Sequence, residues 1–125
     1  MSFHQSCRNI HIVPEHGHTM LLAEVRNIQG KYIPRKIRLD DHIGNTDGWF
    51  IWGGSNFTHS ARNVALEETP WGPKLCADLP MINGGSRGRQ GMMLSDKIQN
   101  NDGRLKFLVS VDNTIGAQLA MLILF

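Results

Sequence analysis

The chain lacks what a disulfide-stapled or membrane-spanning protein needs. Its 125 residues include only two cysteines, Cys7 and Cys76, so at most one disulfide can form within it. A chain of this length can bury a sufficient core without such a bridge. The longest apolar stretch, 117–125, is about half as long as the roughly 20 residues that a membrane-spanning helix requires. The sequence therefore predicts neither a fold that depends on disulfides nor a membrane-spanning helix.

Two further absences narrow the function. Residues 1–10 contain no apolar run of the length that a secretion signal needs, which makes the cytoplasm the expected location. Lys and Arg total 13 against 11 Asp and Glu, and the resulting net charge of +2 is too small to indicate a nucleic-acid or membrane partner. The sequence also contains no motif that predicts a cofactor.

What the chain does contain is an internal repeat. Segment 3–10 recurs 54 positions later as 57–64, with Phe, Ser, Arg and Asn at matching places. Segment 39–48 recurs 55 positions later as 94–103, so the second copy has gained one residue, which lies after Gly84. A unit of this length that occurs only twice indicates a pseudo-symmetric pair of halves with one shared core.

The pattern within each copy is that of β-structure. Residues 21–26 and 75–79 alternate their side chains with a period of two, as strands do. Asp47-Gly48 and Asp102-Gly103 lie between apolar runs and predict tight hairpin turns. A short segment before each hairpin begins with Asp or Ser, residues that cap helices, and predicts a single 3-10 turn. The sequence predicts an all-β fold without long helices.

Four stretches form a further pattern. They are Ser6-Cys7-Arg8-Asn9, Leu39-Asp40-Asp41-His42-Ile43-Gly44-Asn45-Thr46-Asp47-Gly48, Trp52-Gly53-Gly54-Ser55-Asn56-Phe57 and Ser60-Ala61-Arg62-Asn63-Val64. Together they resemble the repeat signature of the cyanovirin-N homologue family, over about residues 2–108. The resemblance implies two pseudo-symmetric tandem repeats, each a three-stranded antiparallel sheet plus a β-hairpin contributed across the repeat boundary.

The resemblance also implies boundaries and an oligomeric state. It predicts one domain over residues 1–109, with repeat one at about 2–54 and repeat two at about 55–109, and it leaves a tail, 110–125, outside the match. In the family, the junction that Gly53-Gly54-Ser55 forms here can act as a hinge through which two chains exchange halves. We expect a monomer from which a domain-swapped dimer is accessible.

The cysteines depart from the family pattern. The best-known member has a disulfide in each repeat, and the corresponding positions are Cys7 with Val25 and Ala61 with Leu79, so both bridges are absent here. We interpret Cys7 as a small buried hydrophobe. Alternation along its strand places Cys76 on the outward face, where it is predicted to be an unpaired thiol.

The implied activity is that of a lectin without catalytic function, which binds mannose-rich glycans, preferably α1-2-linked mannose, with weak affinity at each site. Carried over residue by residue, each of the two implied sites draws on both repeats. The first site comprises Ser2, Gln5, Ser6, Arg26, Ile28, Asn100, Asn101 and Asp102. The second comprises Gly44, Asn45, Asp47, Asn56, Ser60, Pro80, Ile82 and Asn83. The best-known member has acids where this chain has Arg26 and Gly44, and that difference weakens both predicted sites.

Structural roles compete with the sugar-binding roles. Asp47 and Asp102 precede glycine, so each can act as a turn former, as a sugar ligand, or as both. For Arg8 and Arg62, near the start of strands, we favour structural hydrogen bonds, and for Trp52 and Phe107 we favour core packing. The first site is predicted to be the stronger, because its loop keeps its length while the second copy carries the insertion.

Functions of other classes have weaker support. Four histidines, His4, His11, His16 and His18, lack the further ligands that would complete a metal site. His59 next to Ser60 is adjacency in sequence and does not amount to a catalytic pair. A basic cluster, Lys31, Arg35, Lys36 and Arg38, is interpreted as a solvated face. The alternative that stays open is a non-catalytic β-domain with degenerate sugar sites that binds a protein or a nucleic acid.

Overall fold

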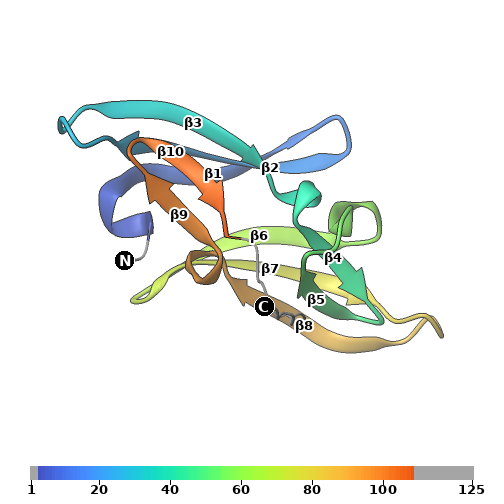
Figure 1. The fold of residues 1–125 in the computed structure, drawn as a ribbon. Helices are drawn as coiled ribbons and strands as arrows, with labels where there is room; N and C mark the ends of the chain where they lie inside the picture. The colour runs from blue at the N-terminus through green and yellow to red at the C-terminus, as the bar shows by residue number, and fades with distance from the viewer. Residues whose placement is uncertain (1–2, 109–125) are drawn as a thin grey trace, which may run out of the picture.

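The computed structural model describes residues 3–108, and these form antiparallel β-structure with four short 3-10 turns and no α-helix (Figure 1). Two sheets have three strands each, in the orders β1-β2-β3 and β6-β7-β8, and two hairpins, β4-β5 and β9-β10, have two each. The strands are β1 (Cys7–Glu15), β2 (His18–Arg26), β3 (Tyr32–Arg38), β4 (Ile43–Thr46), β5 (Trp49–Trp52), β6 (Arg62–Thr69), β7 (Gly72–Pro80), β8 (Ser86–Met93), β9 (Ile98–Asn101) and β10 (Arg104–Phe107). The 3-10 turns are η1 (Phe3–Ser6), η2 (Leu39–Asp41), η3 (Phe57–His59) and η4 (Leu94–Asp96). The predicted fold class is confirmed.

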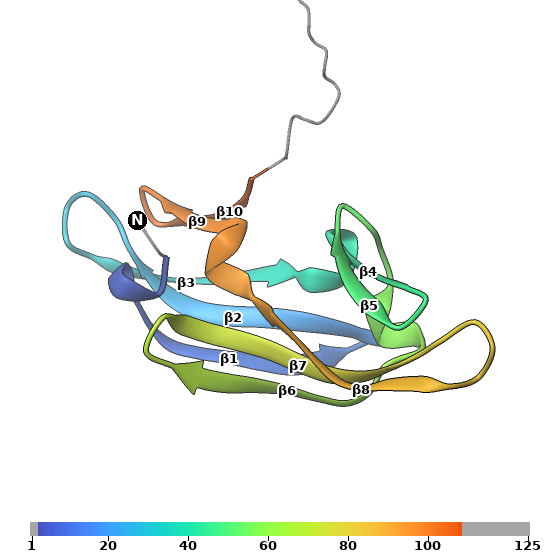
Figure 2. The same cartoon turned by 90° about the horizontal axis from the view of Figure 1, so that it is seen from below.

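Each hairpin packs on the sheet of the other copy. Hairpin β9-β10 lies beside β1-β2-β3, and hairpin β4-β5 lies beside β6-β7-β8, as both views show (Figures 1 and 2). Arg35 Nε of β3 donates to Gly103 O in the first case, and Arg87 Nε of β8 donates to Asp47 O in the second. We call β1-β2-β3 with β9-β10 the first lobe, and β6-β7-β8 with β4-β5 the second lobe.

One core serves both lobes, and matched residues of the two copies supply it. Eight side chains form its centre, none of them more than 1% exposed. They are four pairs that the repeat relates: Phe3 with Phe57, Leu21 with Leu75, Leu39 with Leu94, and Ile43 with Ile98. Trp52 packs against this cluster, and half-buried Phe107 stacks on His42 with 4.1 Å between ring centroids. The two copies of the repeat therefore contribute matched residues to a single core.

The inserted residue of the second copy lies in a strand and leaves the loop unchanged. Pairing between β7 and β8 shifts between Pro80↔Ser86 and Asp78↔Arg89, the mark of a β-bulge. The loops 27–31 and 81–85 have equal length and close with the same turn, in which the N–H of the fourth residue donates to the carbonyl of the first at 3.0 Å. The expected difference in loop length is therefore wrong.

The two thiols are both free and both shielded. Half-buried Cys7 faces Val25 across β1 and β2, and burial raises the pKa of its thiol from 9.0 to about 11. Cys76 is 3% exposed although alternation places it on the outward face. It lies on the central strand β7 opposite Gly91, which has no side chain, and Lys74 crosses above that glycine. Burial there, followed by the charge of Glu67, raises the pKa of Cys76.

One carboxylate is buried between the two copies. Asp40 is 1% exposed and accepts three hydrogen bonds, from Thr19 N at 2.7 Å, Thr58 Oγ1 at 2.8 Å and Thr58 N at 2.9 Å. It therefore ties η2 to β2 and η3. The position that the repeat relates to it is Ser95, whose hydroxyl has a single side-chain partner, His4 Nδ1 at 3.3 Å. Asp40 and Ser95 are therefore a related pair whose hydrogen bonds differ between the two copies.

The junction between the copies is held closed by glycines. A Cβ on Gly44 would lie 2.9 Å from Ser55 N and 3.1 Å from the Cα of Gly54, all of them backbone atoms that have little room to move. The equivalent position in the other hairpin is Gln99, which carries a side chain. The glycine is a requirement of the junction and not of the hairpin.

We expect Gly44→Ala to lower the free energy of unfolding by roughly 1–3 kcal/mol, as overpacking does. It should also raise the fraction of swapped dimer, since exchange relieves strain that is confined to the hinge. Urea unfolding and light scattering measure the two effects. Gln99→Ala is the matched control. If Gly44→Ala and Gln99→Ala change the free energy of unfolding and the fraction of dimer equally, strain at the hinge is not the cause.

Within residues 3–108, no helix is long and apolar enough to cross a membrane. Ser2, position 109 and the tail 110–125 lie outside the described residues.

Candidate functional site

The first candidate site is built around Asn100, at the tip of hairpin β9-β10. Its Oδ1 accepts Gly103 N at 2.8 Å, which closes a turn in which Asp102 and Gly103 both have positive φ. Its Nδ2 donates to Ser6 Oγ and to Arg26 O, each at 2.8 Å. One side chain therefore joins the second copy's hairpin to η1 and to the end of β2.

Asp102 completes this junction. Its Oδ1 accepts the backbone N–H of Ile28 at 2.9 Å, which fixes the loop between β2 and β3 against the hairpin. No partner of its Oδ2 is present among the described residues. A cavity of about 470 Å³ opens between hairpin and loop, lined by Ser6, Arg26, Asn27, Ile28, Gly30, Asn100 and Asp102.

The second lobe repeats the network atom for atom. Asn45 Oδ1 accepts Gly48 N at 2.8 Å, and its Nδ2 donates to Ser60 Oγ at 3.2 Å and to Pro80 O at 3.1 Å. Asp47 Oδ1 accepts the N–H of Ile82 at 2.9 Å. The sequence predicted these residues as partners in one site, and the structure brings them together.

The two sites differ at their acids. In the second lobe, the other carboxylate oxygen of Asp47 is taken by Arg87 Nη2 at 3.1 Å, and the same guanidinium lies 4.5 Å from the ring centroid of Trp49. The corresponding oxygen of Asp102 has no such partner in the part of the chain that the structure describes. The first site therefore keeps an acceptor that the second site has lost.

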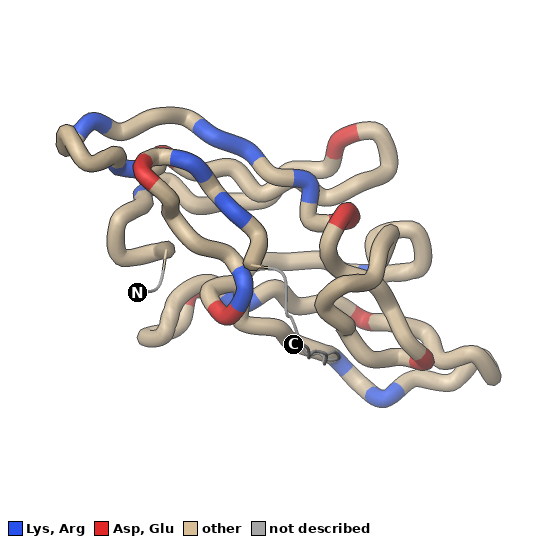
Figure 3. The backbone as a smooth tube through the Cα atoms, viewed as in Figure 1, with Lys and Arg blue, Asp and Glu red and all other residues tan. Residues whose placement is uncertain are grey.

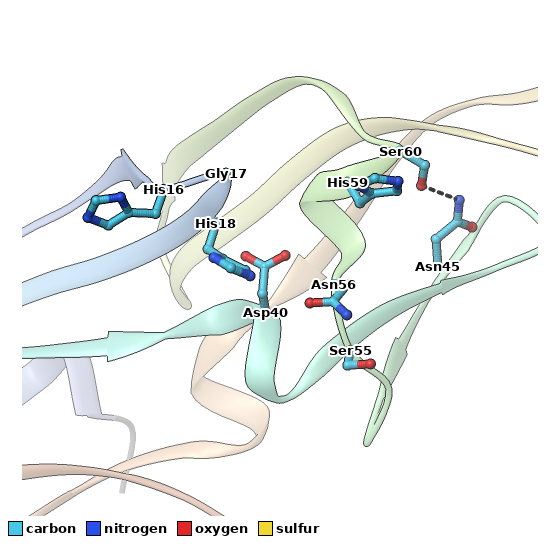
Figure 4. A pocket seen from close by; sticks show the side chains of 9 residues that line it. All are labelled: His16, Gly17, His18, Asp40, Asn45, Ser55, Asn56, His59 and Ser60. Carbon is cyan, nitrogen blue, oxygen red and sulfur yellow. Dashed lines mark hydrogen bonds between the residues drawn. The ribbon is translucent and has the colours of Figure 1, made fainter.

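Two cavities meet at Ser60 in the second lobe. One, of about 570 Å³, extends past Ser60 to the loop between β7 and β8, where Pro80, Gly84 and Ser86 line it. The other, of about 530 Å³, extends to the turn between β1 and β2 (Figure 4). Its lining is His16, Gly17, His18, Asp40, Asn45, Ser55, Asn56, His59 and Ser60.

Sequence reasoning missed the histidine side of this second cavity. His16 and His18 come from the first copy's β1-β2 turn, and no pattern in the sequence pairs that turn with η3. In Figure 4 both rings extend from the turn on one side of Asp40, with Asn56, His59 and Ser60 on the other side. His18 Nδ1 is buried and has no hydrogen-bond partner among residues 3–108.

Other predicted residues lie around these centres. Ile28 and Ile82 project from equivalent loops, 85% and 91% exposed. Asn83 Oδ1 accepts Gly85 N at 2.8 Å and so serves its own loop. Gln5, Asn56 and Asn101 are exposed. Gly44 is buried against the junction, where its backbone pairs with that of Asn56, and Ser2 lies outside the described residues.

The structural role predicted for Arg8 is confirmed. Arg8 Nε and Asn9 Nδ2 each donate to Glu24, both at 2.7 Å, and these bonds, the one from Arg8 first, lower the pKa of the Glu24 carboxyl. The Arg8 guanidinium also lies 3.8 Å from the centroid of the Tyr32 ring. Arg62 instead lines the larger second-lobe cavity.

The sequence matches a known protein family. The CVNH domain, the family of the cyanovirin-N homologues, matches residues 3–106. The chain belongs to the CVNH family. A cyanovirin-N homologue of Tuber borchii is 42% identical over 107 residues, which cover 86% of this chain and 99% of that protein.

Solved CVNH structures share the fold. The NMR structure of Gibberella zeae CVNH has a TM-score of 0.74 at 41% identity, covering 86% of this chain and 97% of that one. The structure of a microvirin:mannobiose complex has a TM-score of 0.74 at 30% identity, covering 85% and 97%. The CVNH fold is a lectin fold, and the two junctions described above are where this chain offers converging polar groups. Across the described residues, no group of three His, Cys, Asp or Glu side chains is arranged to hold a metal ion.

Proposed function

We propose that the chain is a lectin that binds mannose-rich glycans through one site in each lobe, with a preference for α1-2-linked mannose. The observation that carries this proposal is the repeated network of Asn, Ser, Asp and a backbone carbonyl beside a cavity in each lobe. Microvirin, a CVNH relative by structure, has been solved with mannobiose. A mannose unit both donates and accepts hydrogen bonds, which requires paired polar groups of this kind.

The network also determines which atoms remain for a sugar. Both amide protons of Asn100 are used internally, so the side chain can offer only its Oδ1. Asp102 offers an oxygen as well. Donors for the sugar oxygens must therefore come from the rim, where Gln5, Arg26 and Asn101 are exposed.

This division of roles explains the weak affinity that we propose for each site. Neutral hydrogen bonds contribute roughly 0.5–1.5 kcal/mol each, and association costs several kcal/mol, so a shallow site with few free partners binds weakly. Two sites on one rigid core can engage a branched glycan together and so raise the overall affinity. No covalent chemistry enters the proposal.

A glycan array tests the class of ligand. We expect retention on oligomannose spots with terminal α1-2 linkages and weaker retention once those terminal units are removed. Equal retention on all neutral glycans, or none on any, would contradict the proposal.

We expect the first site to be the stronger. The reason is no longer loop length but the free Oδ2 of Asp102, against an Asp47 whose second oxygen is held by Arg87. In an NMR titration with α1-2-linked dimannoside, signals of Ser6 and Asn100 should saturate at a several-fold lower concentration than those of Asn45 and Ser60. The matched variant Arg87→Gln should narrow that difference. The reverse order of saturation would refute the assignment.

A further inference from the structure

The small net charge of the chain conceals a strong division between the lobes. Residues 7–38 and 98–107, which contain the first lobe, hold eight Lys and Arg against three Asp and Glu. Residues 39–97, which contain the second, hold five against seven. Each hairpin packs on the sheet of the other copy, and this arrangement increases the difference in charge because it places Arg104 and Lys106 beside β3. In Figure 3 the blue segments gather on β3, β10 and the loop between β2 and β3.

Ion pairing increases the contrast further. In the first lobe, Glu24 is held by Arg8, and Glu15 by Lys36 at 3.3 Å. Asp102 is the remaining acid. Five exposed cations of this lobe have no carboxylate within 4.0 Å among the described residues: Arg26, Lys31, Arg35, Arg104 and Lys106.

Three of these cations lie at the first site or on the hairpin that carries it. Arg26 lines its cavity. Arg104 lies directly across the hairpin from Asn101, and Lys106 across from Gln99, so the two cations share the exposed face of the hairpin. Arg35 reaches the same turn through its bond to Gly103 O. The basic face of the hairpin therefore starts at the turn whose Asp102 lines the cavity.

The second lobe provides an internal comparison. The residues that the repeat relates to Arg104 and Lys106 are Trp49 and Ile51, both partly exposed, and that related to Arg26 is Pro80. The cation that does approach the second site, Arg87, is neutralised by Asp47 at 3.1 Å. One backbone scaffold thus presents a basic rim in the first lobe and an apolar rim in the second.

We infer that the first site takes a mannose-rich glycan that carries an anionic ester group, phosphate or sulfate, with the ester held by the basic rim of Arg26, Arg104 and Lys106. Guanidinium groups match the paired oxygens of such esters, and unpaired exposed cations can bind one without first breaking an internal ion pair. The second site keeps to neutral sugar. This inference rests on the proposed function and adds to it the charge of the ligand.

The test is calorimetric titration with α1-2-linked dimannoside and with its 6-phosphate and 6-sulfate esters. We expect both esters to bind about tenfold more tightly than the neutral sugar at low salt, as charge-assisted hydrogen bonds permit. The gain should shrink at high salt, because the rim is exposed and screened. A larger gain for the phosphate than for the sulfate would identify the dianion as the preferred group, and the reverse would identify the sulfate.

A matched pair of double variants locates the effect. Arg104→Gln with Lys106→Gln should remove most of the gain and leave the affinity for the neutral sugar unchanged. Lys36→Gln with Arg38→Gln removes the same charge from the same lobe, on residues that already pair with Glu15 and Asp41, and should leave the gain intact. Equal losses in the two variants would show an effect of net charge alone and would overturn the inference.

Two further outcomes are decisive. Equal affinity for the neutral and esterified sugars would overturn the inference while leaving the proposed function in place, whereas failure of all three sugars to bind would remove both. Binding of a polyuridine oligonucleotide to the same face, as tightly as the phosphate ester and in competition with it, would assign the rim to a nucleic acid and overturn the glycan assignment.

Discussion

Replacing Asp40 by alanine is expected to be among the most damaging single changes to this fold. The variant leaves the backbone N–H groups of Thr19 and Thr58 without their acceptor, at a position where the carboxylate is only 1% exposed. Unsatisfied buried donors cost about 1–3 kcal/mol each, so the free energy of unfolding should fall by roughly 2–5 kcal/mol. Domains of this size are stable by only about 5–15 kcal/mol.

Urea unfolding followed by tryptophan fluorescence measures this effect. Ser95→Ala is the control that the repeat itself supplies, since Ser95 occupies the related position and has one long hydrogen bond. It should cost less than about 1 kcal/mol. A similar loss in the two variants would show that the buried carboxylate is not the principal tie between the copies.

Replacing Asn100 by alanine is expected to weaken binding at the first site by about tenfold or more, a loss of at least about 1.4 kcal/mol. The side chain holds hairpin, η1 and β2 in one arrangement through three hydrogen bonds. Their loss should also lower the free energy of unfolding by roughly 1–3 kcal/mol. Binding and stability are coupled here because the same atoms build the site and join the copies.

Asn101→Ala separates the two effects. Asn101 is exposed at the same turn, and its side chain has no hydrogen-bond partner within residues 3–108, so the substitution should leave stability unchanged. If Asn101 contacts sugar, only binding falls. Asn45→Ala should reproduce the Asn100→Ala result in the second lobe, with the first site still responding in NMR spectra. An Asn100→Ala variant that binds normally would refute the role of the network.

Much of the fold could be predicted from local chemistry. Asp-Gly at 47–48 and 102–103 fixes two hairpin turns, and the doubled apolar pattern yields a core of matched pairs such as Phe3 with Phe57. The partners of Asn45 and Asn100 also followed, because the family resemblance places distant segments beside each turn.

The rest depended on three-dimensional context that the sequence does not state. Alternation gave the face of Cys76 but not its burial, which results from Gly91 beside it on the next strand. The close packing of the junction against position 44 also could not be read from the sequence. The net charge of +2 does not predict the basic rim. The rim forms because the hairpin of the second copy packs on the sheet of the first, which places cations some 70 residues apart, such as Lys31 and Arg104, in one lobe.

An NMR titration of the ¹⁵N-labelled chain with α1-2-linked dimannoside, up to millimolar concentration, shows directly whether both junctions bind sugar. We expect two separate groups of shifted signals, one around Ser6 and Asn100 and the other around Asn45 and Ser60, with the first group saturating earlier. Spectra that do not change at either junction would contradict this prediction.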